Sequence, residues 1–460
     1  MQVTNPATGE RIAELPEDTP ATIADKVERA RRAQQKWGTA PLGERIAAIS
    51  RFRRLLADRR EELAQTLTLE VGKPITQSRN ELKGTLPRID FFLENVGRAV
   101  KEETVYEAPT RDLEERIEYE PLGVVANISA WNYPYFVGSN VFIPALLTGN
   151  AVLYKPSEFA ALSGKTISEL LHQAGVPDDV FVLALGGGAV GEALLEQPLN
   201  GVFFTGSYAT GRKIASAAAA RLMKVQLELG GKDPVYVCDD VGDVAAAAAA
   251  VADGAFYNTG QSCCSVERVY VHRRIYEPFV DAFRKTVEGF VVGDPMEEAT
   301  YIGPLTRPAH LAVLERQIAD AKSKGARVLT GGSRLDRRGN YFAPTVAVDV
   351  THEMELMREE TFGPLIGIQP VASDDEAQRL MSDTEYGLTA GVYSKEAERA
   401  HRILSNVNAG SAYWNCCDRV SPRLPWSGRG HSGIGVTLGL DGIRTFVQPK
   451  AWHLRASRTA

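Results

Sequence analysis

The chain has 460 residues, and because a single hydrophobic core rarely grows beyond roughly 250–300 residues, two or more domains are expected. Hydrophobic residues make up 44% of the sequence and charged residues 24%, which are values of a globular protein and exclude a fibrous or disordered chain. The formal net charge of −6 argues against a nucleic-acid-binding protein, which needs a concentrated basic surface.

Four features predict a cytoplasmic protein with no membrane segment and no metal. The N-terminus has no basic stretch followed by an apolar one, so no signal peptide is expected. The longest apolar run, 244–252, is shorter than the roughly 20 residues that span a bilayer. Five cysteines, with two adjacent pairs among them, suit reduced thiols better than a disulfide framework. His352-Glu353 lacks the second histidine that a zinc helix needs.

Helical periodicity dominates the first hundred residues. Apolar residues recur every three or four positions over 46–67, and Gly72 and Pro74 end this pattern. Charged and apolar residues alternate over 115–119 as on an exposed strand, and 122–128 is an apolar run typical of a buried strand. A hairpin or arm is expected to leave the body of the protein there.

After residue 128, short apolar strands and longer helices alternate, which predicts an α/β fold with a parallel sheet. Strands are expected at 151–154, 181–185, 202–204, 224–229 and 235–238, and helices at 163–174 and 191–197. A helix at 243–255 should begin a second α/β part, with further helices at 276–287 and 311–322. Composition marks no boundary between the parts, so we place it near Gly230-Gly231 from the positions of the motifs.

Cys263 is the first candidate for chemistry, because it lies in the polar, glycine-containing segment 256–264 and not on an apolar helix face. A thiol in such a turn can be reached by a substrate, whereas a structural cysteine is normally buried among apolar neighbours. An isolated cysteine is more often structural, so the functional interpretation depends on partners elsewhere in the chain.

Two polar residues could be such partners. Glu228 ends an apolar strand, at the edge where open α/β sheets build their sites, and is a candidate general base. Asn132 follows the strand that ends at Ile128, and its amide could donate to a developing oxyanion. Taken singly, Glu228 could be a solvated glutamate at a strand end and Asn132 a turn former.

A glycine turn after a third strand suits a phosphate group. The strand 202–204 leads into Gly206 and Ser207, and Gly211 lies in the alanine-rich helix that follows, so a helix N-terminus would face the ligand. The spacing differs from the dinucleotide fingerprint G-x-G-x-x-G, which makes this a weak signal by itself.

Together these residues resemble the aldehyde dehydrogenase family, and the resemblance extends over essentially the whole chain. No single motif would suffice, but six occur in the family's order: Trp131-Asn132-Tyr133-Pro134, Lys155-Pro156-Ser157-Glu158, Phe204-Thr205-Gly206-Ser207, Glu228-Leu229-Gly230-Gly231, Gly260-Gln261-Ser262-Cys263 and Glu359-Glu360-Thr361-Phe362-Gly363-Pro364.

The resemblance implies an α/β fold with three parts. These are a Rossmann-like cofactor-binding domain (1–107 and 123–230), an α/β catalytic domain (231–436) and a β oligomerisation arm (108–122 and 437–460). Exposed strands of the arm would be covered by pairing between subunits, so we expect a homodimer or homotetramer.

The reaction implied by the resemblance is the oxidation of an aldehyde to a carboxylic acid. Cys263 would attack the aldehyde carbon, with the oxyanion held by the Asn132 amide and the Cys263 backbone N–H. Glu228 would activate the water that hydrolyses the thioester, so the product would be the free acid.

The cofactor implied by the resemblance is NAD, in preference to NADP. Lys155 and Glu158 would bind the adenosine ribose, and a carboxylate there accepts a ribose hydroxyl but repels a 2′-phosphate. Ser207 would bind the pyrophosphate, and Glu360 and Phe362 the nicotinamide ribose and ring. The remaining residues carried over to the cofactor site are Trp131, Gly206, Gly211 and Leu229.

The loop 413–426 should line the substrate entrance. Its Arg419 and Arg423 resemble those of semialdehyde dehydrogenases, which favours an aldehyde with a carboxylate, such as succinate semialdehyde. The alternative is that both arginines are solvated surface charges. Cys264 could form a strained disulfide with its neighbour on oxidation, although a small packing residue is the favoured interpretation.

Two other functions use the same residues. A cysteine esterase would need Cys263, Asn132 and Glu228 but no cofactor, and the retained Lys155 and Glu158 count against it. A non-catalytic relative would have lost the nucleophile or the base, and this chain has both.

Overall fold

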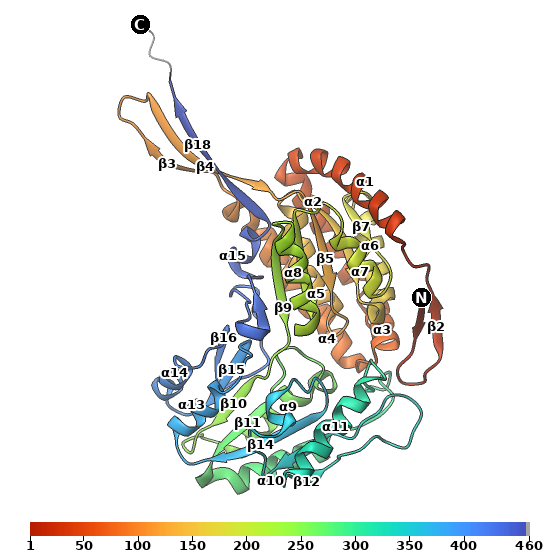
Figure 1. The fold of residues 1–460 in the computed structure, drawn as a ribbon, viewed down its shortest axis with the longest axis vertical. Coiled ribbons are helices and arrows are strands. Elements are labelled where there is room, and N and C mark those ends of the chain that lie inside the picture. The colour runs from red at the N-terminus through yellow and green to blue at the C-terminus, as the bar shows by residue number, and fades with distance from the viewer. Residues whose placement is uncertain (457–460) are drawn as a thin grey trace.

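The computed structural model describes residues 1–456 and contains two sheet-centred parts and a projecting β arm (Figure 1). The expected α/β class with parallel sheets is confirmed. Within the described residues, every helix is too short or too polar to cross a membrane.

The N-terminal segment is a small hairpin followed by four helices. Thr19 caps the first helix by accepting the Thr22 N–H, and the third ends at Gly72, whose φ of 83° is the left-handed conformation that glycine adopts readily. The elements are β1 (Gln2–Thr4), β2 (Arg11–Glu14), α1 (Pro20–Thr39), α2 (Leu42–Asp58), α3 (Arg60–Val71) and α4 (Ile75–Ala99).

The first large sheet has the strand order β17-β9-β8-β5-β6-β7, and all of its strands except β17 run parallel. Its strands are β5 (Val124–Ser129), β6 (Ala151–Pro156), β7 (Phe181–Leu183), β8 (Gly201–Gly206), β9 (Lys224–Leu229) and β17 (Gly433–Ile434). The helices between them are α5 (Pro134–Leu147), η1 (Glu158–Ala160), α6 (Ala161–Gln173), α7 (Gly188–Leu195) and α8 (Tyr208–Ala220).

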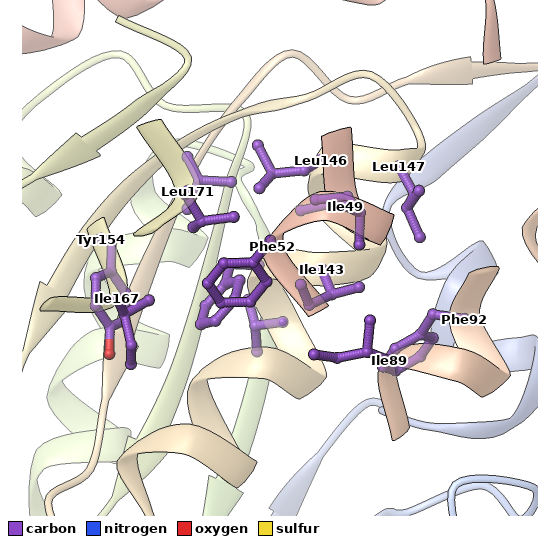
Figure 2. Close-up of a cluster of buried hydrophobic side chains, with 14 of the residues drawn as sticks. Ile49, Phe52, Ile89, Phe92, Ile143, Leu146, Leu147, Tyr154, Ile167 and Leu171 are labelled. Carbon is purple, nitrogen blue, oxygen red and sulfur yellow. The ribbon is translucent and has the colours of Figure 1, made fainter. Parts of the chain in front are cut away.

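Both faces of this sheet are buried, as expected for parallel strands. Alternate residues of β5 point to opposite faces: Val124 and Ala126 pack with α1, α7 and α8, and Val125 packs with α2, α4, α5 and α6. Figure 2 shows the second of these cores, in which Phe52 of α2 lies among aliphatic side chains of α5 and α6.

The second large sheet has the order β12-β13-β14-β11-β10-β15-β16 and is parallel except for β12. Its strands are β10 (Pro234–Val237), β11 (Arg268–His272), β12 (Arg327–Thr330), β13 (Thr345–Val348), β14 (Leu365–Val371), β15 (Thr389–Tyr393) and β16 (Ser411–Trp414). Its helices are α9 (Val244–Phe256), η2 (Tyr257–Gly260), η3 (Arg273–Ile275), α10 (Tyr276–Glu288), α11 (His310–Ser323), α12 (Glu355–Arg358), α13 (Asp374–Ser382) and α14 (Ala397–Leu404).

One sequence expectation about the sheets is wrong. The strand expected at 235–238 does not continue the first sheet, because β10 lies between β11 and β15 of the second. Only 230–233 separate β9 from β10. Parallel neighbours need a crossover of roughly a dozen residues or more, so this short segment carries the chain from one sheet to the other.

The arm is an antiparallel sheet of β3 (Glu103–Glu107), β4 (Leu113–Pro121) and β18 (Val447–Arg455), which projects away from the body (Figure 1). It starts earlier than the expected 108–122, because β3 pairs with β4. In the expected second segment, 437–460, the strand is preceded by α15 (Gly439–Arg444), which packs into the core of the first part. The residues 457–460 of that segment lie outside the described residues. The remaining short helix is η4 (Gly430–Ser432).

Candidate active site

Cys263 lies in the loop between α9 and β11, directly after a distorted turn. Residues 258–260 have φ values of 55°, 59° and 72°, a left-handed conformation that glycine favours and asparagine tolerates but that strains the β-branched Thr259. A Cβ on Gly260 would lie 2.2 Å from the carbonyl oxygen of Gly363, so no other residue fits there. Backbone strain of this kind persists only where surrounding contacts hold it, which is typical of functional sites.

Hydrogen bonds tie this loop to the turn after β5. Nδ2 of Asn132 donates to the carbonyl oxygen of Gln261 at 3.1 Å, and Nδ2 of Asn258 donates to the carbonyl oxygen of Asn132 at 3.3 Å. Asn132 is 3% exposed and lines the same cavity as Cys263. An amide NH2 has two N–H bonds, so the second one is free to donate to a substrate oxygen.

Glu228 ends β9 next to Thr205 of β8 and lines a cavity that also contains Cys263. It is 6% exposed, and its Oε1 accepts a hydrogen bond from Nε1 of Trp426 at 3.2 Å. Burial raises the pKa of Glu228, against the opposing effect of hydrogen bonds with Cys263 and Trp426. A carboxylate with a raised pKa is a stronger base, which suits proton abstraction from water.

The Cys263 thiol is half-buried and has a pKa well above its usual value, because of a hydrogen bond to Cys264, burial and the negative charge of Glu228. Its neighbour Cys264 is buried, and the Cys264 Sγ donates to Oδ1 of Asp418 at 3.0 Å. Cys264 belongs to a buried apolar cluster of the first part, and both cysteines carry free thiols. Formation of the Cys263 thiolate therefore costs free energy at neutral pH, and the negative charge of Glu228 adds to that cost.

Three cavities adjoin along this edge of the protein. The substrate cavity, of about 550 Å³, contains Cys263, Glu228 and Trp426. A second cavity, of about 210 Å³, shares Cys263 with the first and has Asn132 in its wall. A third, of about 360 Å³, shares residues 130–131 and 205–206 with the second. Cys263 thus lies between the substrate cavity and a long two-part groove.

The residues expected to bind a cofactor mostly line this groove. Ser207, Leu229, Glu360 and Phe362 line the second cavity, Lys155 and Glu158 line the third, and Trp131 and Gly206 line both. Gly211 lines neither: its added Cβ would lie 2.6 Å from Leu229 Cδ2, so it allows α8 to pack closely on β9. Of the two expected substrate arginines, Arg419 lines the substrate cavity, and Arg423 is exposed outside its wall.

The inner end of the groove is built for close approach. A Cβ on Gly230 would lie 2.2 Å from Glu360 Oε1, and Glu360 accepts the Gly231 N–H at 3.2 Å. Burial raises the pKa of Glu360 to about 8. The Phe362 ring meets Trp131 edge-on, with ring centroids 5.6 Å apart. A half-buried carboxylate beside an aromatic wall suits a ribose and a flat heterocycle.

A buried ion pair supports the substrate cavity from the side of α4. Lys73 and Glu81 are fully buried and bonded to each other, and the Lys73 ammonium lies 3.7 Å from the centre of the Tyr133 ring. Glu81 also accepts the backbone N–H of Tyr135 at 2.9 Å. This pair fixes the start of α5 against α4.

Replacing Lys73 by methionine is expected to lower the free energy of unfolding by about 3–5 kcal/mol, because Glu81 would be left as an unpaired buried charge. Urea denaturation followed by tryptophan fluorescence measures the change. Lys165→Met is the control, because Lys165 and Glu169 form a surface pair whose side chains are 47% and 46% exposed. Loss of this surface pair should change the free energy of unfolding by less than about 1 kcal/mol. Equal effects of the two substitutions would contradict the prediction.

Comparisons with known proteins agree with this geometry. A sequence profile described as "Aldehyde dehydrogenase family" matches residues 1–452. The peroxisomal aminoaldehyde dehydrogenase 1 of Malus domestica is 34% identical over 460 residues, covering 98% of this chain and 91% of the relative. The chain belongs to the aldehyde dehydrogenase family.

Solved structures of other aldehyde dehydrogenases and related enzymes share the fold. An NAD-dependent aldehyde dehydrogenase from Sinorhizobium meliloti has a TM-score of 0.96 and 34% identity, covering 100% of this chain and 92% of its own. An NADP-dependent enzyme from E. coli also has a TM-score of 0.96, with 31% identity, covering 99% of this chain and 94% of its own. The resemblance inferred from the six motifs is confirmed at the level of family and fold.

Some residues of this aldehyde dehydrogenase's site were not expected from the sequence. Glu81 and Arg88 on α4 line the substrate cavity, and no sequence motif singled out either residue. Each directly precedes a buried apolar residue, Leu82 or Ile89, so both lie beside the apolar side of α4. That position was the available signal.

Proposed function

We propose that this aldehyde dehydrogenase oxidises an aldehyde to the carboxylic acid with NAD, through covalent intermediates on Cys263. The observation that carries the proposal is the position of Cys263 between two cavities. One contains Glu228, and the other contains Asn132 and Glu360. In such an enzyme the aldehyde is bound to the cysteine while a cofactor removes hydride from it. The substrate cavity and the cofactor groove must therefore meet at the thiol.

The proposed reaction begins with loss of the Cys263 thiol proton to solvent water and attack of the thiolate on the aldehyde carbon. The Asn132 Nδ2 donates a hydrogen bond to the resulting oxyanion. NAD held by residues such as Lys155, Glu158 and Glu360 would supply the hydride acceptor, and loss of hydride from that carbon would leave a thioester on Cys263. Glu228 then removes a proton from the water that attacks the thioester and passes it to the departing Cys263 sulfur, so the acid leaves as the thiol re-forms.

The groove has donors and acceptors that fit a dinucleotide. Ser207 caps α8 by accepting the Thr210 N–H, so the N-terminus of this helix is available to a pyrophosphate. Glu158 and Lys155 offer a carboxylate and an ammonium to a ribose, and Glu360 offers a half-buried carboxylate to the other ribose. These residues would hold and orient the cofactor next to Cys263.

Glu158→Gln is expected to lower the preference for NAD over NADP by roughly tenfold, because a neutral amide no longer repels a 2′-phosphate. The measurement is the ratio of kcat/KM for the two cofactors at a saturating aldehyde concentration. Glu169→Gln is the control, because Glu169 is a surface residue outside the groove. An unchanged ratio in Glu158→Gln would refute the role of Glu158 in cofactor choice.

The test of the proposed function is NADH absorbance with purified protein, NAD or NADP, and a panel of acidic, neutral and cationic aldehydes. Appearance of NADH together with the free acid supports it. Hydrolysis of an activated ester without cofactor, and no oxidation of any aldehyde, would favour the esterase alternative.

The proposed substrate is an aldehyde with a carboxylate, of which succinate semialdehyde is an example. Arg419 in the cavity wall supports this proposal, whereas Arg423 lies outside the wall. The name of the Malus domestica relative points to a cationic aminoaldehyde as the alternative. The panel separates the two by the charge of the preferred aldehyde.

We also propose a homodimer or homotetramer held by the arm, and a cytoplasmic location that keeps Cys263 reduced. Val105 and Tyr106 of β3 are 56% and 47% exposed. Exposed apolar side chains on a strand at the edge of a small sheet favour pairing with another subunit. The assignment of 1–107 and 123–230 to a cofactor domain and of 231–436 to a catalytic domain stays a proposal, adjusted for the arm that begins at Glu103.

A further inference from the structure

Arg88 is a buried cation in the wall of the substrate cavity, which is also lined by Cys263. It is 6% exposed, and its guanidinium lies 4.1 Å from the centre of the Phe136 ring. Nη1 donates to Oδ1 of Asn140 at 3.0 Å. Ring and amide together fix the guanidinium in one orientation.

Among residues 1–456, no carboxylate forms an ion pair with Arg88, and its bond to Asn140 is its one hydrogen bond to the protein. Burial lowers the pKa of Arg88 to about 10, so the group keeps its charge near neutral pH. The carboxylates in the same wall are already bound to other protein groups: Glu81 to Lys73, Glu228 to Trp426, Asp253 to Tyr301 and Asp418 to Cys264.

A buried cation without a counter-ion is unfavourable, and an anion from outside the protein would remove that penalty. The free edge of a guanidinium offers two parallel N–H donors, which match the two oxygens of a carboxylate. Asn140 adds a third donor. Its Oδ1 accepts from Arg88, so its NH2 group remains for a ligand in the cavity, whose wall includes Asn140.

We propose that Arg88, assisted by Asn140, binds the carboxylate of a short aldehyde acid whose aldehyde carbon reaches Cys263. This inference rests on the proposed function of Cys263 and names the class of substrate that the site takes. Arg419, which lies at the exposed side of the cavity, then has the lesser role of attracting the anion.

Arg88 has an alternative role, because its charge also acts on Cys263 and Glu228. An arginine that only stabilises the thiolate would affect all aldehydes equally. An arginine that binds the substrate's carboxylate affects acidic aldehydes selectively. The informative quantity is therefore a ratio: kcat/KM for an aldehyde acid divided by kcat/KM for the aldehyde of the same length with a terminal carboxamide.

Arg88→Met, which keeps an apolar stem against Phe136, should lower this ratio by roughly 30-fold or more. Arg88→Lys should lower it less, since the charge remains but the paired donors are lost. Arg423→Met is the matched control and should leave the ratio unchanged, because Arg423 lies outside the cavity wall. An unchanged ratio in Arg88→Met, or a wild-type preference for cationic or neutral aldehydes, would overturn the proposal.

A second test is titration calorimetry of the wild-type protein with succinate and glutarate and with their monoamides. It requires neither catalytic turnover nor a variant that folds. Tighter binding of the dicarboxylates by the wild-type protein supports the proposal, and equal binding overturns it. If dicarboxylates bind more tightly than their monoamides and no aldehyde is oxidised, the proposed function fails alone. If neutral aldehydes are oxidised and dicarboxylates bind no better than monoamides, the inference about Arg88 fails alone.

Discussion

Replacing Cys263 by serine is expected to reduce NADH formation by a factor of roughly 10³ or more with every aldehyde. A hydroxyl in the same place keeps the shape of the loop but is a far weaker nucleophile than a thiolate. Steady-state absorbance, with circular dichroism to verify folding, measures the loss. Cys416→Ser is the matched control, because Cys416 is a thiol of similar exposure outside the cavities.

The control should change the rate by less than about threefold, as expected for a substitution away from the site. Mass spectrometry after mixing with aldehyde and NAD should detect an acylated peptide that contains Cys263 in the wild-type protein. Comparable activity in Cys263→Ser and wild type would remove the central element of the proposed mechanism.

Replacing Glu228 by glutamine is expected to slow the steady state by roughly 10²–10⁴-fold, since hydrolysis of the thioester loses its general base. The first turnover should survive in part, because loss of the negative charge of Glu228 removes one cause of the raised Cys263 pKa. Rapid mixing should then show a burst of NADH close to one per active site, followed by slow turnover.

The pH dependence of the steady-state rate is an independent test of Glu228 as the general base. Glu228 acts as a base only when ionised, and burial raises its pKa. The wild-type rate should therefore fall as the pH drops through that raised value, and Glu228→Gln should lose this limb of the profile. Burst and steady state reduced by the same factor would instead assign Glu228 to the activation of the Cys263 thiol.

Local sequence patterns were sufficient for much of the fold, whereas the grouping of Cys263 with Glu228 and Asn132 was expected from the family resemblance. The apolar runs of β5, β6, β8 and β9 lie where expected, because strands buried on both faces leave a continuous apolar signal. Glu228 and Asn132 come together at Cys263 because the carboxyl ends of parallel strands meet at one edge.

The sequence was less informative where position depends on contacts between distant segments. The transfer of β10 to the second sheet follows from the shortness of the 230–233 connection, a geometric constraint that apolarity does not encode. Gly211 resembled a phosphate-binding glycine, but the packing of Leu229 accounts for it. The unpaired state of Arg88 became visible only once its neighbours in space were known.

The contact between Gly260 and Gly363 has a consequence for how the enzyme responds to its ligands. Gly260 precedes the nucleophile and Gly363 follows the segment that carries Glu360 and Phe362, and the two backbones touch without any side chain between them. Backbone segments in direct contact cannot shift separately in a close-packed interior. A molecule that displaces the Glu360 segment will therefore also alter the reactivity of Cys263, so thiol alkylation rates can report cofactor binding in the absence of any aldehyde.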